Sequence, residues 1–342
     1  MERLHSLLVI RLSSLGDVLF ALPAVQALVS SGRAERVSWL VEDRAAALLS
    51  GVAGLHEVVV FPRTQPGRWL THALTMRRRR DDVVLDMQGT LKTRVQLGLL
   101  RAPRKLGFDS SLARDGADRA LTEHVQPPSW ARHRVEQGVA LVDALGVDIP
   151  RRPERPTIAV DPSAAERVSA FIERLPGKGP VVVLHPGTSA FGALKRWPPE
   201  HFAALGAALA RSAGARLLIN GGPGDEPQVA AVRAALRVPA TPVPPGSLTD
   251  LTAWMSAADA VVAADSLPLH LANALGTPVV GLYGPKDPAV TGPFFDRATV
   301  VRAGVACSPC TLRRCGDRIC MQHLPVDEVE AATLALLRER AP

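Results

Sequence analysis

Short apolar segments alternate with helix-like segments along the whole chain, and this alternation limits the possible folds more than any other feature. The first half contains strand candidates at residues 7–12, 37–41, 58–61, 83–87 and 106–108. Most of them are separated by helical stretches, such as residues 18–29. The strand candidates are continuous runs of Val, Leu and Ile, which is typical of parallel strands buried on both faces. The sequence therefore predicts an α/β protein built on parallel sheets.

The same pattern starts again in the second half, with strand candidates at residues 181–184, 217–220, 260–264 and 279–282. A chain of 342 residues suits two domains of about 150 residues each. Three prolines in residues 148–156 argue against a continuous helix there. Because residues 157–160 look like a strand, we predict a hinge near 176–180. The predicted units are 1–175, 176–325 and a final helical segment at 326–342.

The chain carries 40 basic and 33 acidic residues, a net charge of +7. Such an excess favours an acidic partner, namely a phosphorylated small molecule, an anionic membrane or nucleic acid, or else is a solvated basic surface. The basic residues lack interleaved aromatic residues, which argues against nucleic acid. No apolar run approaches the roughly 20 residues that span a bilayer, and residues 7–10 are too short for the core of a signal peptide. We therefore expect a cytoplasmic protein.

Three loops follow strand candidates, at the edge where parallel sheets bind ligands. They are residues 11–17, residues 185–189 running on to 195–198, and residues 265–270. In the third loop, Ser266 can cap a helix whose free N–H groups form an anion site, with His270 one turn along. The alternative is an ordinary helix cap with a packed histidine. Neither a Walker A motif nor a Gly-x-Gly-x-x-Gly fingerprint after a strand occurs.

Two ionisable residues in these loops are candidates for chemistry. Asp17 stands at the start of a helix, where an aspartate is either a partner of the helix dipole or, with a substrate hydroxyl within about 3 Å, a general base. Lys195 is one of only five lysines among the 40 basic residues. Its use beside Arg196 suggests that a compact ammonium is required there. The sequence by itself leaves both alternatives open.

Taken in order, these motifs resemble those of the bacterial lipopolysaccharide heptosyltransferase family over nearly the whole chain. The first half contributes residues 10–18 with Pro23, residues 86–89 with Lys92, and residues 133–137 before 145–146. The second half matches best, at residues 185–189, 195–198, 222–226, 265–266, 270–272 and 281–285.

The resemblance implies the GT-B fold, in which two Rossmann-like domains with parallel sheets face each other across a cleft. The N-terminal domain would bind the acceptor, the C-terminal domain the nucleotide-sugar, and the last helix would cross back to the N-terminal domain. It implies inverting, metal-independent transfer of L-glycero-D-manno-heptose from ADP-heptose to Kdo-lipid A or heptosyl-Kdo-lipid A. The protein would be a monomer at the cytoplasmic face of the inner membrane, with no required cofactor.

The resemblance also implies roles for individual residues. Asp17 would be the general base, and Lys195 would neutralise charge on the leaving diphosphate. The residues implied to bind the donor are Gly187, Thr188, Ser189, Lys195, Glu226, Met255, Asp265, Ser266 and His270. Those implied to bind the acceptor are Ser13, Gly16, Lys92, Arg94 and His133, and the nearby Arg101, Arg104 and Lys105 could meet its phosphates or form a solvated basic face.

One position departs from the family pattern, because Leu267 stands where a glycine usually follows the Asp-Ser pair. Glycine allows the closest approach of the backbone to a phosphate. Because of this departure, the identity of the nucleotide-sugar donor stays open. The alternatives are a related GT-B transferase that uses another nucleotide-sugar and a non-catalytic nucleotide-sugar-binding protein.

The four cysteines of the chain, Cys307, Cys310, Cys315 and Cys320, fall within fourteen residues. Such a cluster is typical of tetrahedral zinc, but the spacing is not that of a standard zinc ribbon. A cytosolic setting disfavours disulfides. We expect free thiols, with structural zinc as the alternative.

Overall fold

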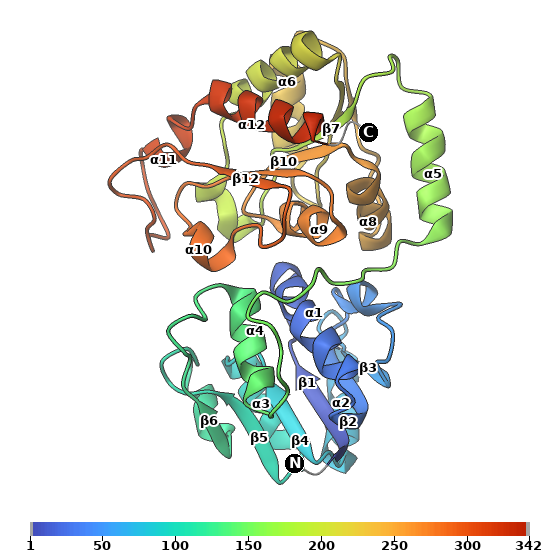
Figure 1. Ribbon diagram of the computed structural model, residues 1–342, viewed down its shortest axis with the longest axis vertical. Helices are drawn as coiled ribbons and strands as arrows, with labels where there is room; N and C mark the ends of the chain where they lie inside the picture. Colours follow the sequence, from blue (N-terminus) through green and yellow to red (C-terminus); the bar gives the residue numbers. More distant parts are fainter. Residues whose placement is uncertain (1–2, 340–342) are drawn as a thin grey trace. The chain divides into compact units, whose positions relative to one another are not determined.

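The computed structural model describes residues 3–339, with the side chains of residues 190 and 191 left aside. Residues 1–2 and 340–342, the outermost parts of the first and last predicted units, lie outside the described residues. The chain divides into two compact units, Met1–Ala159 and Val160–Pro342 (Figure 1). No helix within residues 3–339 is both long and apolar enough to cross a membrane.

The first unit is built on a six-stranded, all-parallel sheet with the order β3-β2-β1-β4-β5-β6. Its strands are β1 (Leu4–Ile10), β2 (Ala34–Glu42), β3 (Glu57–Phe61), β4 (Val83–Asp86), β5 (Arg104–Phe108) and β6 (Glu123–Val125). The strand order reverses at β1, which pairs with both β2 and β4. Ligands of doubly wound sheets bind beyond the carboxyl ends of the strands at such a switch point. The segment that follows Ile10 is therefore the expected position of a site.

Helices cover both faces of this sheet. They are α1 (Leu15–Ser30), α2 (Trp69–Arg78), α3 (Leu91–Leu99) and α4 (Arg134–Asp143), with short 3-10 turns at Ala46–Leu49, Pro66–Arg68 and Ala117–Ala120. Helix α1 packs against α4, and α2 packs against α3. Successive side chains of a strand point to opposite faces. Accordingly, Leu8 and Ile10 of β1 share one core cluster with Met76 of α2 and Leu97 of α3.

The second unit repeats this plan, with the parallel sheet order β12-β11-β10-β7-β8-β9. Its strands are β7 (Val181–His185), β8 (Arg216–Ile219), β9 (Ala240–Pro242), β10 (Ala260–Ala264), β11 (Val279–Leu282) and β12 (Ala298–Val301). Counted within each unit, both sheets have the order 3-2-1-4-5-6 that is typical of Rossmann-like domains. The predicted α/β class with two Rossmann-like domains is confirmed.

The helices of the second unit are α5 (Pro162–Glu173), α6 (Pro199–Ala213), α7 (Glu226–Ala235), α8 (Leu248–Ala257), α9 (Leu267–Leu275), α10 (Pro288–Thr291), α11 (Ile319–Gln322) and α12 (Val326–Arg338), with a 3-10 turn at Ala190–Lys195. The core contains Trp197 and Phe202, whose rings pack edge to face with centroids 5.0 Å apart. The indole nitrogen of Trp197 donates to the carbonyl of Leu324 at 3.2 Å. Leu324 lies just before α12, so this bond fixes the start of that helix against the same core.

The boundary between the units lies at 159/160 and not at the predicted 175/176. Helix α5 belongs to the second unit because it packs against α8. The Phe171 and Trp254 rings meet edge to face at 5.2 Å, and Arg167 pairs with Asp250 at 2.6 Å. Residues 157–160 form no strand, contrary to the expectation that placed the hinge later.

The expectation for the last helix also differs from the structure. Helix α12 is part of the second unit, where it packs on α6 and on strands β10, β11 and β12. Its Val329 and Leu336 are buried in that core, and Ser212 of α6 donates to Glu330 at 2.7 Å. Because the apolar stripe of α12 is covered within the second unit, α12 belongs to that unit, whereas the final segment was predicted to be a separate one.

The start of α8 allows a test of local stability. The hydroxyl of Ser247 accepts from the Asp250 backbone N–H at 3.1 Å, and the Asp250 carboxylate accepts from the Ser247 N–H at 2.9 Å. These bonds satisfy backbone donors that a helix start leaves free. We expect Ser247→Ala to lower the free energy of unfolding by about 1 kcal/mol. Denaturant unfolding measures this change, with Ser256→Ala at an exposed position of the same helix as control. Equal stability of the two variants would contradict the assignment of the cap.

Candidate active site

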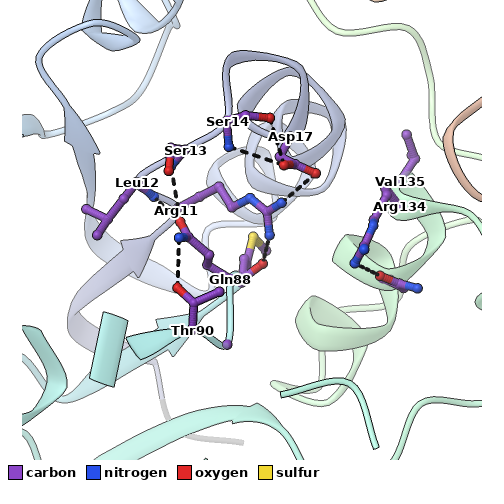
Figure 2. Close-up of polar contacts among 12 residues, drawn as sticks. Arg11, Leu12, Ser13, Ser14, Asp17, Gln88, Thr90, Arg134 and Val135 are labelled. Atoms are coloured by element: carbon purple, nitrogen blue, oxygen red, sulfur yellow. Dashed lines mark hydrogen bonds and ion pairs between the residues drawn. The ribbon is translucent and has the colours of Figure 1, made fainter. Parts of the chain in front are cut away.

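In the first unit, the loop after β1 places a carboxylate at the start of α1. Asp17 is the third residue of α1, and its carboxylate accepts from the Ser14 N–H at 3.2 Å and the Ser14 hydroxyl at 2.9 Å (Figure 2). The other oxygen pairs with Arg11 at 2.8 Å. Arg11 itself, at the end of β1, also donates to the carbonyl of Met87. The carboxylate is thereby held in one orientation at the switch point of the sheet.

The charge state of Asp17 follows from its neighbours. Burial acts to raise its pKa, but the positive charges of Arg11 and Arg134 and the hydrogen bonds from Ser14 outweigh burial and lower the pKa below its ordinary value. Asp17 is therefore a carboxylate at neutral pH, which is the form that a general base requires. Its basicity is reduced by the same contacts.

A polar pocket adjoins this carboxylate. Gln88 anchors the loop, because its side-chain oxygen accepts from the Leu12 and Ser13 N–H groups at 2.8 and 3.1 Å and its amide donates to Thr90 at 2.9 Å (Figure 2). The pocket is partly open to solvent. Its polar lining includes Arg11, Asp17, Asp86, Gln88, Arg134 and Gln137. Arg11, Gln88 and Arg134 are not among the predicted site residues, although Arg11 and Gln88 lie inside motifs and Arg134 follows His133.

Three of the predicted acceptor residues lie in, or contact, the loop that carries Asp17. Ser13 and Gly16 lie in the segment that carries Asp17. Lys92 of α3 reaches the same loop, where its ammonium donates to Ser13 at 3.3 Å and to Glu42 at 2.7 Å. Lys92 therefore contacts the loop that carries Asp17 and is neutralised there by Glu42.

Two other predicted acceptor residues have structural partners. His133 is buried at the start of α4, where its Nδ1 accepts from the Val135 N–H at 3.1 Å and its ring packs edge to face on Phe20. Arg94 donates to the carbonyl of Asp115 at 3.3 Å. The helix cap and the loop contact account for these side chains, and the structure does not favour their assignment to the acceptor.

The three basic residues that follow α3 also differ in their contacts and exposure. Arg104 forms two hydrogen bonds with Glu123 across neighbouring strands, at 2.6 and 2.9 Å. Lys105 donates to the carbonyl of Leu97, and burial lowers the pKa of its ammonium. Arg101 is exposed. Of these three residues, Arg101 retains the character of a solvated cation.

In the second unit, a charged network lies beyond the ends of β7 and β10. Lys195 ends a 3-10 turn and donates to the backbone carbonyl of Asp265 at 2.5 Å and to its carboxylate at 3.0 Å. The other carboxylate oxygen of Asp265 lies 3.0 Å from Nε2 of His270. Burial acts to raise the pKa of Asp265, but His270 and Lys195 outweigh it and hold the pKa far below its ordinary value. The aspartate is thus a fixed anion that orients Lys195.

The start of α9 lies beside this network and has the properties of an anion site. The first N–H groups of a helix have no partner within the helix and carry the positive end of its dipole. Ser266 precedes α9, and its buried hydroxyl has no hydrogen-bond partner among the described residues. Leu267 is the first helical residue and is partly buried. Lys195 and the start of α9 could therefore hold a diphosphate together.

The loop after β7 shows which predicted residues face solvent. Thr188 is buried, with its hydroxyl accepting from Arg196 at 3.1 Å, whereas Ser189 is exposed. Position 187 requires a glycine for a structural reason, because a Cβ there would lie 2.0 Å from a carboxylate oxygen of Asp225. The predicted role of Gly187 in donor binding is therefore better described as making room for that buried carboxylate.

The structure also shows different environments for the neighbouring residues Asp225 and Glu226. Asp225 is buried and accepts from the Gly222 N–H at 2.9 Å, while Glu226 is exposed at the start of α7. Of the two, only Glu226 is accessible from solvent, and its predicted contact with the donor stays a prediction. Met255 of α8 is fully buried, and its side chain presents no surface to a ligand, so the structure does not favour its predicted contact with the donor.

The cysteine segment lies near the C-terminal end of β11. Cys307, Cys310, Cys315 and Cys320 are free thiols, and Cys320 is buried. Burial and the neighbouring Cys307, Cys310 and Cys315 raise the pKa of Cys320. Within residues 3–339, no group of three or more His, Cys, Asp or Glu side chains is arranged to hold a metal ion.

Comparisons with known proteins agree with this geometry. The family model for glycosyltransferase family 9 (heptosyltransferase) matches residues 69–318. Lipopolysaccharide heptosyltransferase 1 of Pseudomonas aeruginosa is 26% identical over 318 residues, which cover 90% of this chain and 86% of that protein. Among solved structures, a glycosyl transferase family 9 protein from Veillonella parvula has a TM-score of 0.83 at 20% identity, with 99% of each chain covered. The Escherichia coli heptosyltransferase WaaC with ADP has a TM-score of 0.73 at 24% identity, with 96% of this chain and 99% of that chain covered.

Proposed function

The chain belongs to glycosyltransferase family 9, the heptosyltransferases, and on that premise we propose that it transfers L-glycero-D-manno-heptose from ADP-heptose to the inner core of lipopolysaccharide. The acceptor in this proposal is Kdo-lipid A or heptosyl-Kdo-lipid A. The observation that carries the proposal is the ionised, oriented Asp17 at the edge of a polar pocket. A carboxylate so held can remove a proton from an acceptor hydroxyl.

The proposed reaction is a single displacement that inverts the anomeric carbon. The acceptor hydroxyl loses its proton to Asp17 as its oxygen bonds to the anomeric carbon of the heptose. The bond between that carbon and the diphosphate oxygen breaks, and ADP leaves with the electron pair. Arg11 and Ser14 hold the base in place through contacts of 2.8 and 2.9 Å.

The second unit supplies the stabilisation of the leaving group in this proposal. Negative charge grows on the diphosphate as the bond breaks, and fixed donors aimed at such charge lower the barrier. Lys195, oriented by Asp265, and the N–H groups at the start of α9 are those donors. Since these groups are cationic or dipolar, we propose that the reaction proceeds without a metal ion or another cofactor.

The identity of the donor is tested by nucleotide binding. WaaC of Escherichia coli was solved with ADP, and its likeness to this chain supports an adenine nucleotide. We expect ADP and ADP-heptose to raise the thermal unfolding temperature, and UDP- and GDP-sugars to leave it unchanged. Stabilisation by UDP- or GDP-sugars alone would favour a transferase with another donor, for which Leu267 is the motivating observation. Binding of ADP-heptose without turnover on any acceptor would favour a non-catalytic nucleotide-sugar-binding protein.

The acceptor is tested by transfer to purified lipid acceptors. Mass spectrometry should show one added heptose on either Kdo-lipid A or heptosyl-Kdo-lipid A, but not on both. Core oligosaccharide from a deletion strain should be truncated at the same sugar. Addition to neither acceptor would contradict the proposed inner-core substrate. We further propose that the protein acts as a monomer at the cytoplasmic face of the inner membrane, in peripheral contact with it.

Arg134 provides a test of the base that leaves Asp17 in place. Its positive charge lowers the pKa of Asp17, and its guanidinium donates to Gln137 at 3.0 Å. Removing a cation destabilises the carboxylate, so Arg134→Met should raise the pKa of Asp17. We expect the acid limb of the kcat/KM profile, where activity is lost as the base becomes protonated, to move to higher pH.

The matched control for this measurement is Arg94→Met, which removes an arginine that contacts the carbonyl of Asp115. Its acid limb should coincide with that of the wild-type protein. An acid limb that stays in place in Arg134→Met would contradict Asp17 as the titrating base.

A further inference from the structure

Most of the exposed large hydrophobic side chains of the protein are concentrated in one region. The largely exposed ones among the described residues are Val60, Trp69, Leu70, Leu74, Leu91, Val95, Leu312 and Ile319. Six of these eight lie between residues 60 and 95, on β3, α2 and α3 and at no other position of the first unit. Exposed apolar side chains that gather in this way mark an interaction surface more often than scattered ones do.

The exposed residues of α2 and α3 lie on the outward side of one helical layer. On α2, Leu70 is 72% and Leu74 is 49% exposed, and on α3, Leu91 and Val95 are each 54% exposed. Each pair is four residues apart and therefore occupies one helix face. The opposite faces contribute Met76 and Leu97 to the core.

The two helices are neighbours, so their outward faces form a continuous surface. Helix α2 packs against α3, and Nε2 of His72 lies 2.9 Å from the side-chain oxygen of Gln96, with both groups buried. Trp69, at the start of α2, is partly exposed and donates its indole N–H to the carbonyl of Pro62 at 2.9 Å. A tryptophan of this kind, with its polar group satisfied and its ring accessible, suits the boundary between water and lipid.

Positive charge surrounds these apolar side chains. Residues 63–80 contain six arginines and no Asp or Glu, and of these arginines only Arg79 forms an ion pair among the described residues, with Glu57 and Asp81. Over the whole chain, basic and acidic residues are nearly balanced, at 40 and 33. Arg77 and Arg78 are exposed at the end of α2 and form no ion pair within the described part of the chain. Apolar side chains bordered by unpaired arginines are complementary to a surface that offers both hydrocarbon and phosphate.

We propose that Leu70, Leu74, Arg77, Arg78, Leu91 and Val95, which we call the α2–α3 face, dock on an anionic phospholipid bilayer. The leucines and the valine enter the boundary between headgroups and acyl chains, and the arginines contact lipid phosphates. This inference rests on the peripheral membrane contact proposed above and assigns a surface to it. It does not depend on the donor, the acceptor or the role of Asp17.

The position of α3 relates this face to the pocket. Leu91 of the α2–α3 face is followed by Lys92, whose ammonium lies 3.3 Å from the Ser13 hydroxyl in the loop that carries Asp17. Gln88 and Gly89, which line the pocket, precede α3 in the chain, so the start of α3 lies near both the docking surface and the pocket. A sugar acceptor that stays anchored by its lipid would be presented to the pocket by the same helix that contacts the bilayer.

The test is sedimentation of the full-length protein with lipid vesicles, without donor or acceptor. The wild-type protein should bind vesicles of equal parts phosphatidylglycerol and phosphatidylcholine, and bind vesicles of pure phosphatidylcholine at least tenfold more weakly. The double variant Leu70→Ser/Leu74→Ser should lose at least tenfold in affinity for the anionic vesicles. The double variant Arg77→Gln/Arg78→Gln should lose roughly fivefold per arginine and become less sensitive to salt.

The controls are changes of the same kind in the second unit. Leu312→Ser removes an exposed leucine, and Arg233→Gln/Arg237→Gln removes two exposed arginines. Both should bind vesicles like the wild-type protein, and all variants should unfold at the wild-type temperature. Transfer to a detergent-solubilised acceptor should be retained in the α2–α3 variants, which separates the failure of this inference from the failure of the proposed reaction.

Tryptophan fluorescence adds a site-specific signal. The emission of Trp69 should shift to shorter wavelength with anionic vesicles, and Trp69→Phe should remove the shift. The proposal is overturned if the wild-type protein does not bind anionic vesicles. It is also overturned if neither double variant binds more weakly than its control, or if the arginine variant alone is impaired, which would indicate an electrostatic contact without insertion.

Discussion

An Asp17→Asn variant is expected to transfer sugar about 10²- to 10⁴-fold more slowly than the wild-type protein, the range typical for loss of a general base. Asparagine keeps the size of the side chain and can still accept a hydrogen bond from Ser14 at the start of α1, but it cannot take the proton of an acceptor hydroxyl. The loss should therefore fall on kcat. Binding of ADP should be unchanged, because Asp17 lies in the first unit and the proposed nucleotide site in the second.

Asp250→Asn is the matched control for this variant. Asp250 is also the third residue of a helix and also accepts from the N–H and hydroxyl of a serine three residues earlier, at 2.9 and 2.7 Å. It differs in having no place in the proposed site. Its asparagine variant should keep wild-type transfer, apart from some loss of stability. Comparable transfer by Asp17→Asn and Asp250→Asn would show that Asp17 is a helix cap and nothing more.

A Lys195→Met variant is expected to lower kcat about 10²- to 10³-fold, as is typical when one preorganised donor to a developing negative charge is removed. Methionine retains much of the apolar stem of lysine but has no ammonium to place on the diphosphate. The effect should be largest in single-turnover measurements, because these isolate the step in which the bond to the leaving group breaks.

The ion pair with Asp265 provides an alternative explanation for such an effect. Lys195 and Asp265 lie 3.0 Å apart, so removal of the ammonium also leaves a buried carboxylate with one partner fewer. Thermal unfolding distinguishes the two explanations. A purely structural lysine would lower the unfolding temperature while the folded fraction kept its kcat. Lys178→Met, at an exposed position of the same unit, should change neither quantity.

Several elements of the fold could be predicted because the information lies within short segments. Continuous apolar runs such as residues 181–184 indicate strands buried on both faces, and parallel strands require crossover helices between them. The loops at the ends of such strands then become site candidates without any knowledge of contacts. Asp17, Lys195, Asp265 and Ser266 were located in this way.

The sequence did not indicate the surroundings of side chains whose partners are distant in the sequence. His133 was predicted to bind the acceptor, but its ring packs on Phe20 of another helix. Gly187 was assigned to the donor, but it makes room for Asp225 from the next strand-to-helix loop. Met255 is buried because other segments of the chain cover its face of α8, and the sequence around Met255 does not indicate this. The boundary between the units lies earlier in the chain than predicted for the same reason, because α5 packs against α8, which is distant in the sequence.

By itself, the sequence determined the α/β class, the repeated plan of two parallel sheets and the loops in which chemistry is expected, because strand and helix periodicity and helix starts are local properties. Only the tertiary structure decided that the pKa of Asp17 is lowered despite burial, because the charge of Arg134, more than a hundred residues away, adds to that of Arg11. It also decided that Asp265 orients Lys195 across 70 residues of chain. Electrostatic contacts act over a few ångströms in space, and folding alone determines which residues come within that distance.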